Sequence, residues 1–261
     1  MIDYHWFDTN RLIVFIALAV TFLLVIYFIE KAKGGKELFV RSIAGLAKID
    51  EAVGRATEMG KPILYIPGID DMNNIQTVAS MIILGNVAKT VAQYDTPIIV
   101  PLRSTFVLPV AEEAVRQGYL SAGRPDAFNK DNIRYISDEQ FAYAASVNGI
   151  MLREKPAANL LLGSFFAESL VLAETGFSTG AIQIAGTANI HQLPFFIVAC
   201  DYTLIGEELF AASAYLSREP KLIGALKGSD YVKAIVLIVL SAGAILVSLG
   251  QNWIVDWFVV K

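Results

Sequence analysis

Polar and charged side chains follow several short apolar runs of this chain, and they are the residues that could do chemistry. Such runs are typical of buried strands, and in open α/β sheets ligands bind just outside the carboxyl ends of the strands. The carboxylates among them could hold a cation or a basic ligand, and the arginine would pair with them or bind an anion. We therefore predict a small polar pocket lined by Asp70, Arg103, Ser164, Glu168, His191 and Asp201.

An alternative interpretation gives the polar residues at the strand ends a purely local structural role. Short polar side chains at strand ends cap the helices that follow, and every α/β domain needs them. Glu168 stands apart, because it lies in a very apolar helical segment, 165–175, where a buried carboxylate needs a partner. The residues expected as caps are Asp71, Asn73, Ser104, Asp138 and Ser164.

The usual catalytic motifs are missing from the sequence. The segment from Gly54 to Gly60-Lys61 has one residue too many for a P-loop, and Pro62 stands where Ser or Thr must bind magnesium. No G-x-G-x-x-G follows a strand run, and no G-x-S-x-G elbow occurs. A lone cysteine, Cys200, excludes a disulfide scaffold and a cysteine-based zinc cluster. We predict no cofactor and no metal site, and the sequence favours a protein that is not an enzyme.

The elements that position these residues alternate between strand and helix periods. Alternation of this kind predicts an α/β fold with a mostly parallel sheet, helices on both faces, and a Rossmann-like topology. Strands are expected at 63–66, 98–100, 133–136, 159–162, 181–184 and 195–198, and helices at 37–59, 73–94, 108–120, 138–154, 165–175 and 207–216. Only residues 187–194 separate the last two strand runs, which is short for a parallel crossover. Those two strands are expected to be antiparallel or joined by a cramped turn.

Two apolar segments flank this domain. The chain is 55% hydrophobic with a net charge of −4, and its mean hydropathy of +0.52 is high for a soluble enzyme. Residues 12–29 contain no charge and are long enough to cross a bilayer, and 234–250 form a similar run. We predict transmembrane helices at 12–29 and 231–250; the alternative is two buried core helices. Asp3 and Asp8 argue against a cleaved signal peptide.

The flanking charges predict how these helices are oriented. Seven lysines and arginines lie just inside the two spans, against two outside, which places the loop in the cytoplasm. The resulting organisation is an external tail (1–11), a first span, a cytoplasmic α/β domain (30–230), a second span and an external interfacial tail (251–261) carrying Trp253 and Trp257. The expected location is the inner cell membrane.

A surplus of apolar residues remains after both spans are removed. Helical segments such as 73–94 and 207–216 are apolar around most of their circumference, which indicates burial on two sides. We expect a homo-oligomer or a subunit of a membrane complex, with the lipid bilayer as a partner. The absence of basic clusters makes nucleic acid an unsuitable partner. A ligand-binding or sensory domain and a membrane-associated enzyme of unknown reaction remain as alternatives.

Several stretches resemble a family of uncharacterised prokaryotic membrane proteins whose shared region is known as a domain of unknown function. The resemblance covers most of the predicted cytoplasmic part and implies a membrane setting and a bacterial or archaeal source. It implies no activity and no catalytic residues. The stretches are TPIIVPLRS (96–104), AGRPDAF (122–128), ISDEQFAYAA (136–145), REKPAANLLLGSFFAESLVLAETG (153–176) and AIQIAGTANIHQLPFFIVACDYTLIGEELFAASAYL (181–216).

Overall fold

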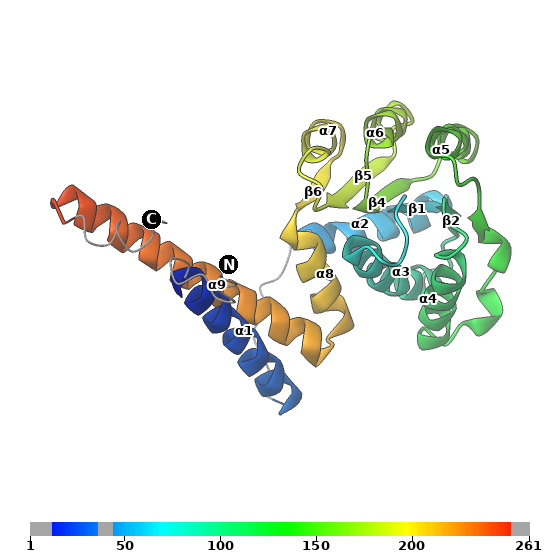
Figure 1. The fold of residues 1–261 in the computed structure, drawn as a ribbon. Coiled ribbons are helices and arrows are strands. Elements are labelled where there is room, and N and C mark those ends of the chain that lie inside the picture. The colour runs from blue at the N-terminus through cyan, green and yellow to red at the C-terminus, as the bar shows by residue number, and fades with distance from the viewer. Residues whose placement is uncertain (1–11, 36–43, 252–261) are drawn as a thin grey trace, which may run out of the picture. The chain divides into compact units, whose positions relative to one another are not determined.

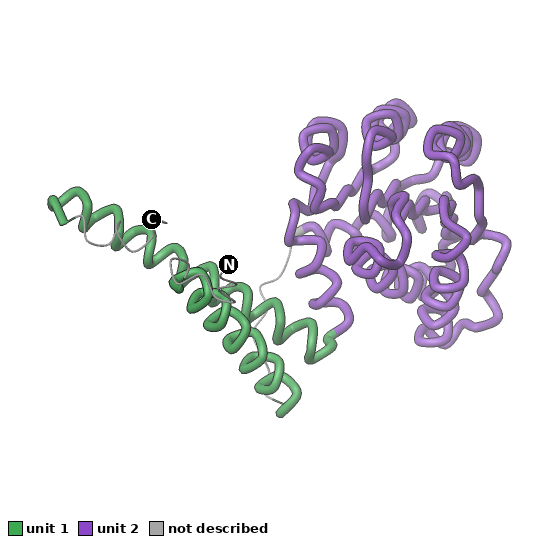
Figure 2. The backbone as a smooth tube through the Cα atoms, viewed as in Figure 1, with its two compact units in different colours: residues 1–40, 218–261 green, residues 41–217 purple. Residues whose placement is uncertain are grey.

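The chain divides into two compact units. A computed structural model describes residues 12–35 and 44–251. One unit joins both ends of the chain, residues 1–40 and 218–261, and the other is formed by residues 41–217 (Figure 2). The predicted external tail 1–11, with His5, and residues 252–261 of the predicted C-terminal tail lie outside the described residues.

The larger unit is built on a six-stranded, entirely parallel sheet. Its strand order is β3-β2-β1-β4-β5-β6, so β1 has its sequence neighbour β2 on one side and β4 on the other. The predicted α/β class with a parallel sheet is confirmed. The strands are β1 (Ile63–Gly68), β2 (Ile98–Leu102), β3 (Ile133–Tyr135), β4 (Ala158–Ser164), β5 (Ile182–Thr187) and β6 (Tyr202–Ile205).

Helices cover both faces of this sheet. Figure 1 shows α5, α6 and α7 on one face and α3, α4 and α8 on the other. Buried strand residues such as Leu64, Ile66 and Leu161 form a core with Tyr143 and Phe165 from the α5–α7 side. The helices of this unit are α2 (Ala44–Met59), α3 (Ile75–Gln93), α4 (Leu108–Ser121), α5 (Gln140–Glu154), α6 (Glu168–Ser178), α7 (Leu193–Ala199) and α8 (Glu207–Ser217), with short 3-10 turns at Pro125–Ala127 and Lys130–Asn132.

One predicted strand is wrong. Residues 195–198 belong to α7, which begins beside Pro194, a residue suited to the first turn of a helix. Periodicity alone cannot distinguish a strand from a helix in an apolar run this short. The sixth strand is instead β6, and it pairs parallel to β5 because α7 supplies the crossover.

Within residues 12–35 and 44–251, three helices are apolar and long enough to cross a membrane, and they differ in burial. The apolar window of α3 is 56% buried within the chain, against 6% for α1 (Leu12–Lys33) and for α9 (Pro220–Ser248). α3 packs on the sheet with α4 on one side and α8 on the other, which explains why it is apolar on several sides. The long apolar runs of α1 and α9 are therefore not core helices of this chain.

Helices α1 and α9 pack against each other backbone to backbone. A Cβ built on Gly224 would lie 2.5 Å from Cα of Ile29, and one on Gly228 would lie 2.8 Å from Cα of Val25. Because the contacts run forward along α9 and backward along α1, the two helices are antiparallel. The spacing Gly224-x-x-x-Gly228 is typical of closely packed membrane helices. The rings of Phe28 in α1 and Tyr231 in α9 also stack, with their centroids 4.7 Å apart.

A pair of glycine substitutions tests the helix packing of the α/β unit. A Cβ on Gly118 of α4 would lie 2.6 Å from the Gly85 oxygen of α3, so Gly118→Ala should destabilise the domain by about 1–3 kcal/mol. Gly54 of α2 has open space at its Cβ, and Gly54→Ala should stabilise by about 0.5–1 kcal/mol. Thermal unfolding in mild detergent measures both. Equal shifts of the same sign would contradict the close α3–α4 contact.

Candidate functional site at the carboxyl edge of the sheet

The carboxyl ends of β1 and β4 meet where the chain changes direction in the sheet. From β1 the chain proceeds outward through β2 to β3, and it then returns to place β4 on the opposite side of β1. In open parallel sheets such a switch point leaves a crevice, because the following loops turn to opposite faces. A ligand-binding site is therefore expected at the loops that follow β1 and β4.

Two glycines allow these loops to approach backbone to backbone. Gly163 has a φ of 151°, and a Cβ there would lie 2.0 Å from the Pro67 oxygen. Gly68, at a φ of 88°, would place its Cβ 2.2 Å from the Ser164 oxygen. The amide of Ile69 donates to that same oxygen at 2.9 Å. Any larger residue at either glycine would separate the two loops.

The contact brings Asp70 and Ser164 together. Oδ2 of Asp70 accepts from Oγ of the buried Ser164 at 2.6 Å and from Nδ2 of Asn74 at 2.7 Å. Asn74 is also the N-cap of α3, where its Oδ1 accepts from the amide of Gln76. The Asp70 carboxylate thus ties the β4 loop to the first turn of α3.

Arg103, at the end of β2, joins the same cluster through the backbone. Its Nη1 donates to the Ile69 oxygen at 2.7 Å. Its Nε is buried and has no hydrogen-bond partner among the described residues. The neighbouring Ser104 donates to the carboxylate of Asp71 and accepts from the amide of Phe106.

Glu168 is completely buried, and it has the partners that a buried carboxylate needs. Nε2 of Gln140 donates to its Oε2 at 2.5 Å, and the amide of Phe166 donates to its Oε1 at 2.9 Å. Burial, and then the charge of Glu168, raise the pKa of the Tyr143 phenol, whereas Arg103 lowers it. The charges of Glu168 and Arg103 thus both act on Tyr143, whose hydroxyl donates to the Pro101 oxygen at 3.0 Å.

His191 lies on the same edge but on an exposed surface. It belongs to the loop between β5 and α7. This loop is linked to the β4 loop because Nδ2 of Asn189 donates to the Phe165 oxygen at 2.7 Å. Among the described residues no group of three His, Cys, Asp or Glu side chains is arranged to hold a metal ion.

Asp201 lies at the opposite edge of the sheet from the other candidates. It precedes β6, and its Oδ2 accepts from the amide of Gln183 near the start of β5 at 2.8 Å. The expectation that Asp201 follows a strand rested on the strand at 195–198, which is a helix. Next to it, burial and then the charge of Asp201 raise the pKa of the Cys200 thiol to about 12.

The residues predicted to cap the helix N-termini are not the ones whose side chains do so. Asn74 and Glu139 are the side chains that accept from the first turns of α3 and α5, whereas α4 and α6 have no side-chain cap. Ser164 and Ser104 instead donate to Asp70 and Asp71. The side-chain amides that join these loops were not predicted from the sequence. They belong to Asn74, Gln140, Asn189 and Gln76, whose Oε1 accepts from the amide of Ala188 at 2.7 Å.

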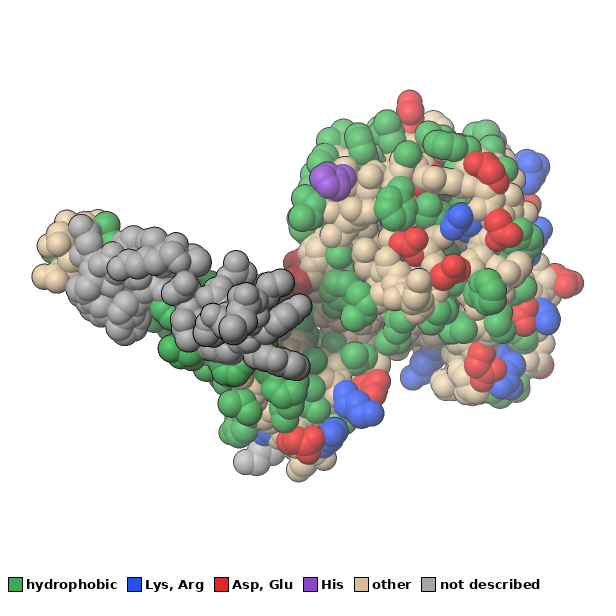
Figure 3. Space-filling view, in the orientation of Figure 1, with side chains coloured by type: hydrophobic (Ala, Val, Ile, Leu, Met, Phe, Trp, Pro, Cys, Tyr) green, Lys and Arg blue, Asp and Glu red, His purple; other side chains and the backbone are tan. Residues whose placement is uncertain are grey.

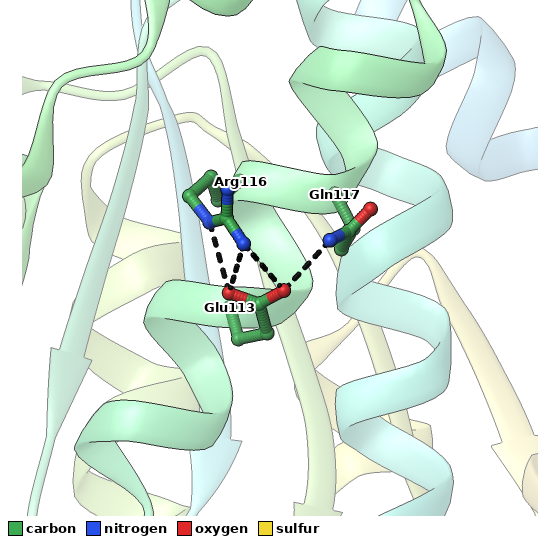
Figure 4. A network of polar contacts seen from close by, with 3 residues as sticks. All are labelled: Glu113, Arg116 and Gln117. Atoms are coloured by element: carbon green, nitrogen blue, oxygen red, sulfur yellow. Dashed lines mark hydrogen bonds and ion pairs between the residues drawn. The ribbon is translucent and has the colours of Figure 1, made fainter.

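A second polar network, on α4, is a surface feature. Glu113 accepts from Nη2 of Arg116 at 2.8 Å and from Nε2 of Gln117 at 2.7 Å (Figure 4). The hydrogen bonds from Gln117 and Arg116 lower the pKa of the Glu113 carboxyl. All three lie on one exposed helix at i, i+3 and i+4 spacing, where such pairs stabilise a helix only slightly. Glu113 and Gln117 also border a mostly apolar groove of about 810 Å³ along α3 and α4.

The role of Asp70 can be tested by two substitutions. Both donors reach the same oxygen, so Asp70→Asn should cost less than about 1 kcal/mol, whereas Asp70→Ala leaves the buried Ser164 hydroxyl unpaired and should cost about 1–3 kcal/mol. Asp138→Ala, at an exposed residue following β3, is the matched control and should change stability by less than about 0.5 kcal/mol. Denaturant unfolding measures all three. Equal losses for the Ala variants would show that Asp70 does not join the loops.

Comparison with known proteins supplies a family and no activity. A family profile described as "Domain of unknown function (DUF6754)" matches residues 2–258, nearly the whole length. No curated protein and no solved structure matches the chain. The match includes the helices α1 and α9 and the complete α/β unit, in agreement with the family resemblance of the sequence stretches. The chain belongs to the DUF6754 family.

Proposed function

We propose that this is a non-enzymatic membrane protein whose Rossmann-like domain self-assembles or scaffolds a larger membrane complex. In this proposal α1 and α9 span the inner cell membrane, the α/β domain lies in the cytoplasm, and both termini are external. The observation that carries the proposal is the exposed apolar surface of α1 and α9, whose apolar windows are only 6% buried. Soluble monomers rarely expose contiguous apolar surface of this extent.

The details of the helix pair fit a lipid setting. Two hydroxyls in the apolar runs are satisfied within their own helix, since Thr21 donates to the Ala17 oxygen and Ser248 to the Ala244 oxygen, each at 2.8 Å. Backbone groups of a helix are likewise satisfied internally, as a bilayer requires. Close packing of Gly224 and Gly228 on α1 brings the two helix backbones together, as in membrane helix pairs.

The antiparallel pairing supports the proposed orientation. It places the end of α1 and the beginning of α9 at the same end of the pair. Lysines concentrate there, and an excess of Lys and Arg favours the cytoplasmic side. They are Lys31 and Lys33 in α1 and Lys221 and Lys227 in α9. Residues 34–43 and 218–219 are the short connections to the α/β domain, so the domain is expected close to the membrane surface.

The hydrogen bonds of the side chains at the carboxyl edge of the sheet support an assembly role over catalysis. Both oxygens of Glu168 and Oδ2 of Asp70 accept hydrogen bonds from neighbouring side chains and a backbone amide. A nucleophile or general base needs a proton-transfer partner within reach of an open substrate position. Several large apolar side chains of the domain are exposed at the same time, among them Phe106, Phe177 and Val198.

The proposal is tested by extraction and by particle mass. Membranes washed at high pH should retain the chain, because a two-helix anchor is held by apolar contacts that do not depend on charge. The particle extracted in mild detergent should contain more than one 28.5 kDa chain or a copurifying partner. Release at high pH would refute the anchor, and a clean monomer without a partner would refute the assembly role.

A second candidate function is a ligand-binding or sensory domain whose ligand binds at the carboxyl edge of the sheet, near the ends of β1 and β4. The buried Nε of Arg103 favours it, because a buried donor without a partner is uncommon and this one lies beside the β1–β4 crevice. An anionic ligand would satisfy it.

Thermal-shift screening of nucleotides and small acids tests this candidate. A ligand at 100 times its Kd should add about 2.7 kcal/mol of stability, and Arg103→Lys should remove the shift while Asp138→Ala preserves it. Identical shifts in the wild type and in Arg103→Lys would place the ligand elsewhere, and the absence of any shift would count against the candidate.

A further inference from the structure

The outer sides of α6 and α7 carry exposed apolar side chains that the membrane anchor does not explain. The two helices are neighbours: the rings of Phe165 and Phe196 meet edge to face at 5.2 Å, and Ser169 donates to Gln192 at 2.6 Å. Hydrophobic side chains gather over both helices (Figure 3). We call the following set the α6–α7 face: Phe166, Leu170, Val171, Phe177, Ile190, Phe195, Ile197 and Val198.

The size of this face suits a protein interface. Val198 is 86% exposed, Ile190 77% and Phe177 71%, and the other five are 38–54% exposed. With full side-chain areas of about 150–200 Å², these fractions correspond to on the order of 800 Å² of apolar surface. The largest apolar patch of a typical monomer is about 300–600 Å². One partner of a standard interface contributes about 800 Å².

The charge distribution distinguishes a protein partner from a lipid surface. Residues 156–217 contain no lysine and no arginine, and the exposed ionisable side chains in and next to α6 and α7 include Glu174, His191 and Asp201. Surfaces that bind lipid headgroups combine apolar residues with Lys and Arg, which this region lacks. An almost uncharged face can meet a copy of itself without like-charge repulsion, as a two-fold symmetric interface requires.

We propose that the α6–α7 face is the contact between two copies of this chain, paired about a two-fold axis. The proposal rests on the proposed function, since it names the surface through which the domain self-assembles. Anchoring in one membrane also favours this contact, because it confines the copies to a plane with a common orientation and raises their effective concentration.

Cross-linking of single cysteines in native membranes tests the contact directly. In a Cys200→Ser background, Phe177→Cys and Val198→Cys place a thiol on the face, and Met59→Cys places one at an exposed position at the end of α2. A short bis-maleimide should give a product of twice the 28.5 kDa chain mass at both face positions, at least about fivefold more than at Met59→Cys. Equal yields at all three positions, or none, would overturn the proposal.

A disrupting variant gives an independent measurement. Phe177→Asp combined with Val198→Asp should reduce the detergent-extracted particle from two chains to one. The variant should still unfold cooperatively, because both side chains are exposed in the single chain. If the wild type assembles and this variant assembles equally, the face is wrong and the assembly role stands. A wild-type monomer without cross-links overturns both. Protection of the face thiols by lipid without cross-linking would assign the face to the membrane and also overturn the proposal.

Discussion

The exposed apolar surface of α1 and α9 is the constraint on which the proposed role depends. The two helices bury little beyond their own contact at Gly224 and Gly228, and they leave side chains such as Phe22 and Leu240 about two-thirds exposed. Apolar area of this kind is unfavourable in water at about 25 cal/mol per Å². Since both helices belong to one antiparallel pair, the same environment must surround both. In the proposed function a bilayer supplies this environment, and the α/β domain between the two helices would then be held at a membrane surface.

Within the α/β domain, the close approach of β1 and β4 determines what the carboxyl edge can do. Gly68 and Gly163 let the two loops touch, and Asp70 then receives hydrogen bonds from Ser164 and Asn74. The carboxylate oxygen that receives both hydrogen bonds stabilises the contact between the loops. Arg103 retains a buried donor without a partner among the described residues, and it is the feature of this edge that still points to a ligand.

The sequence predicts the elements better than it predicts the contacts between them. Five of the six strand runs are strands of the sheet, because continuous apolar runs between helical patterns have few other interpretations in an α/β chain. The run 195–198 is a helix, since a short apolar segment carries no decisive period and the signal lay in Pro194. Because 195–198 was predicted to be a strand, Asp201 was expected at the carboxyl edge of the sheet, whereas it lies at the opposite edge. The amides of Asn74 and Gln140 could not be foreseen, because their roles depend on loops brought together across the sheet.

Labelling of single cysteines in sealed right-side-out vesicles tests the central claim most directly. In a Cys200→Ser background, a membrane-impermeant maleimide should label Lys261→Cys in intact vesicles. It should label Tyr94→Cys, exposed at the end of α3 in the α/β domain, only after permeabilisation. This pattern would place the domain and the C-terminus on opposite sides of a bilayer. Labelling of both positions in intact vesicles, or of neither, would contradict an α/β domain held in the cytoplasm by the α1–α9 pair.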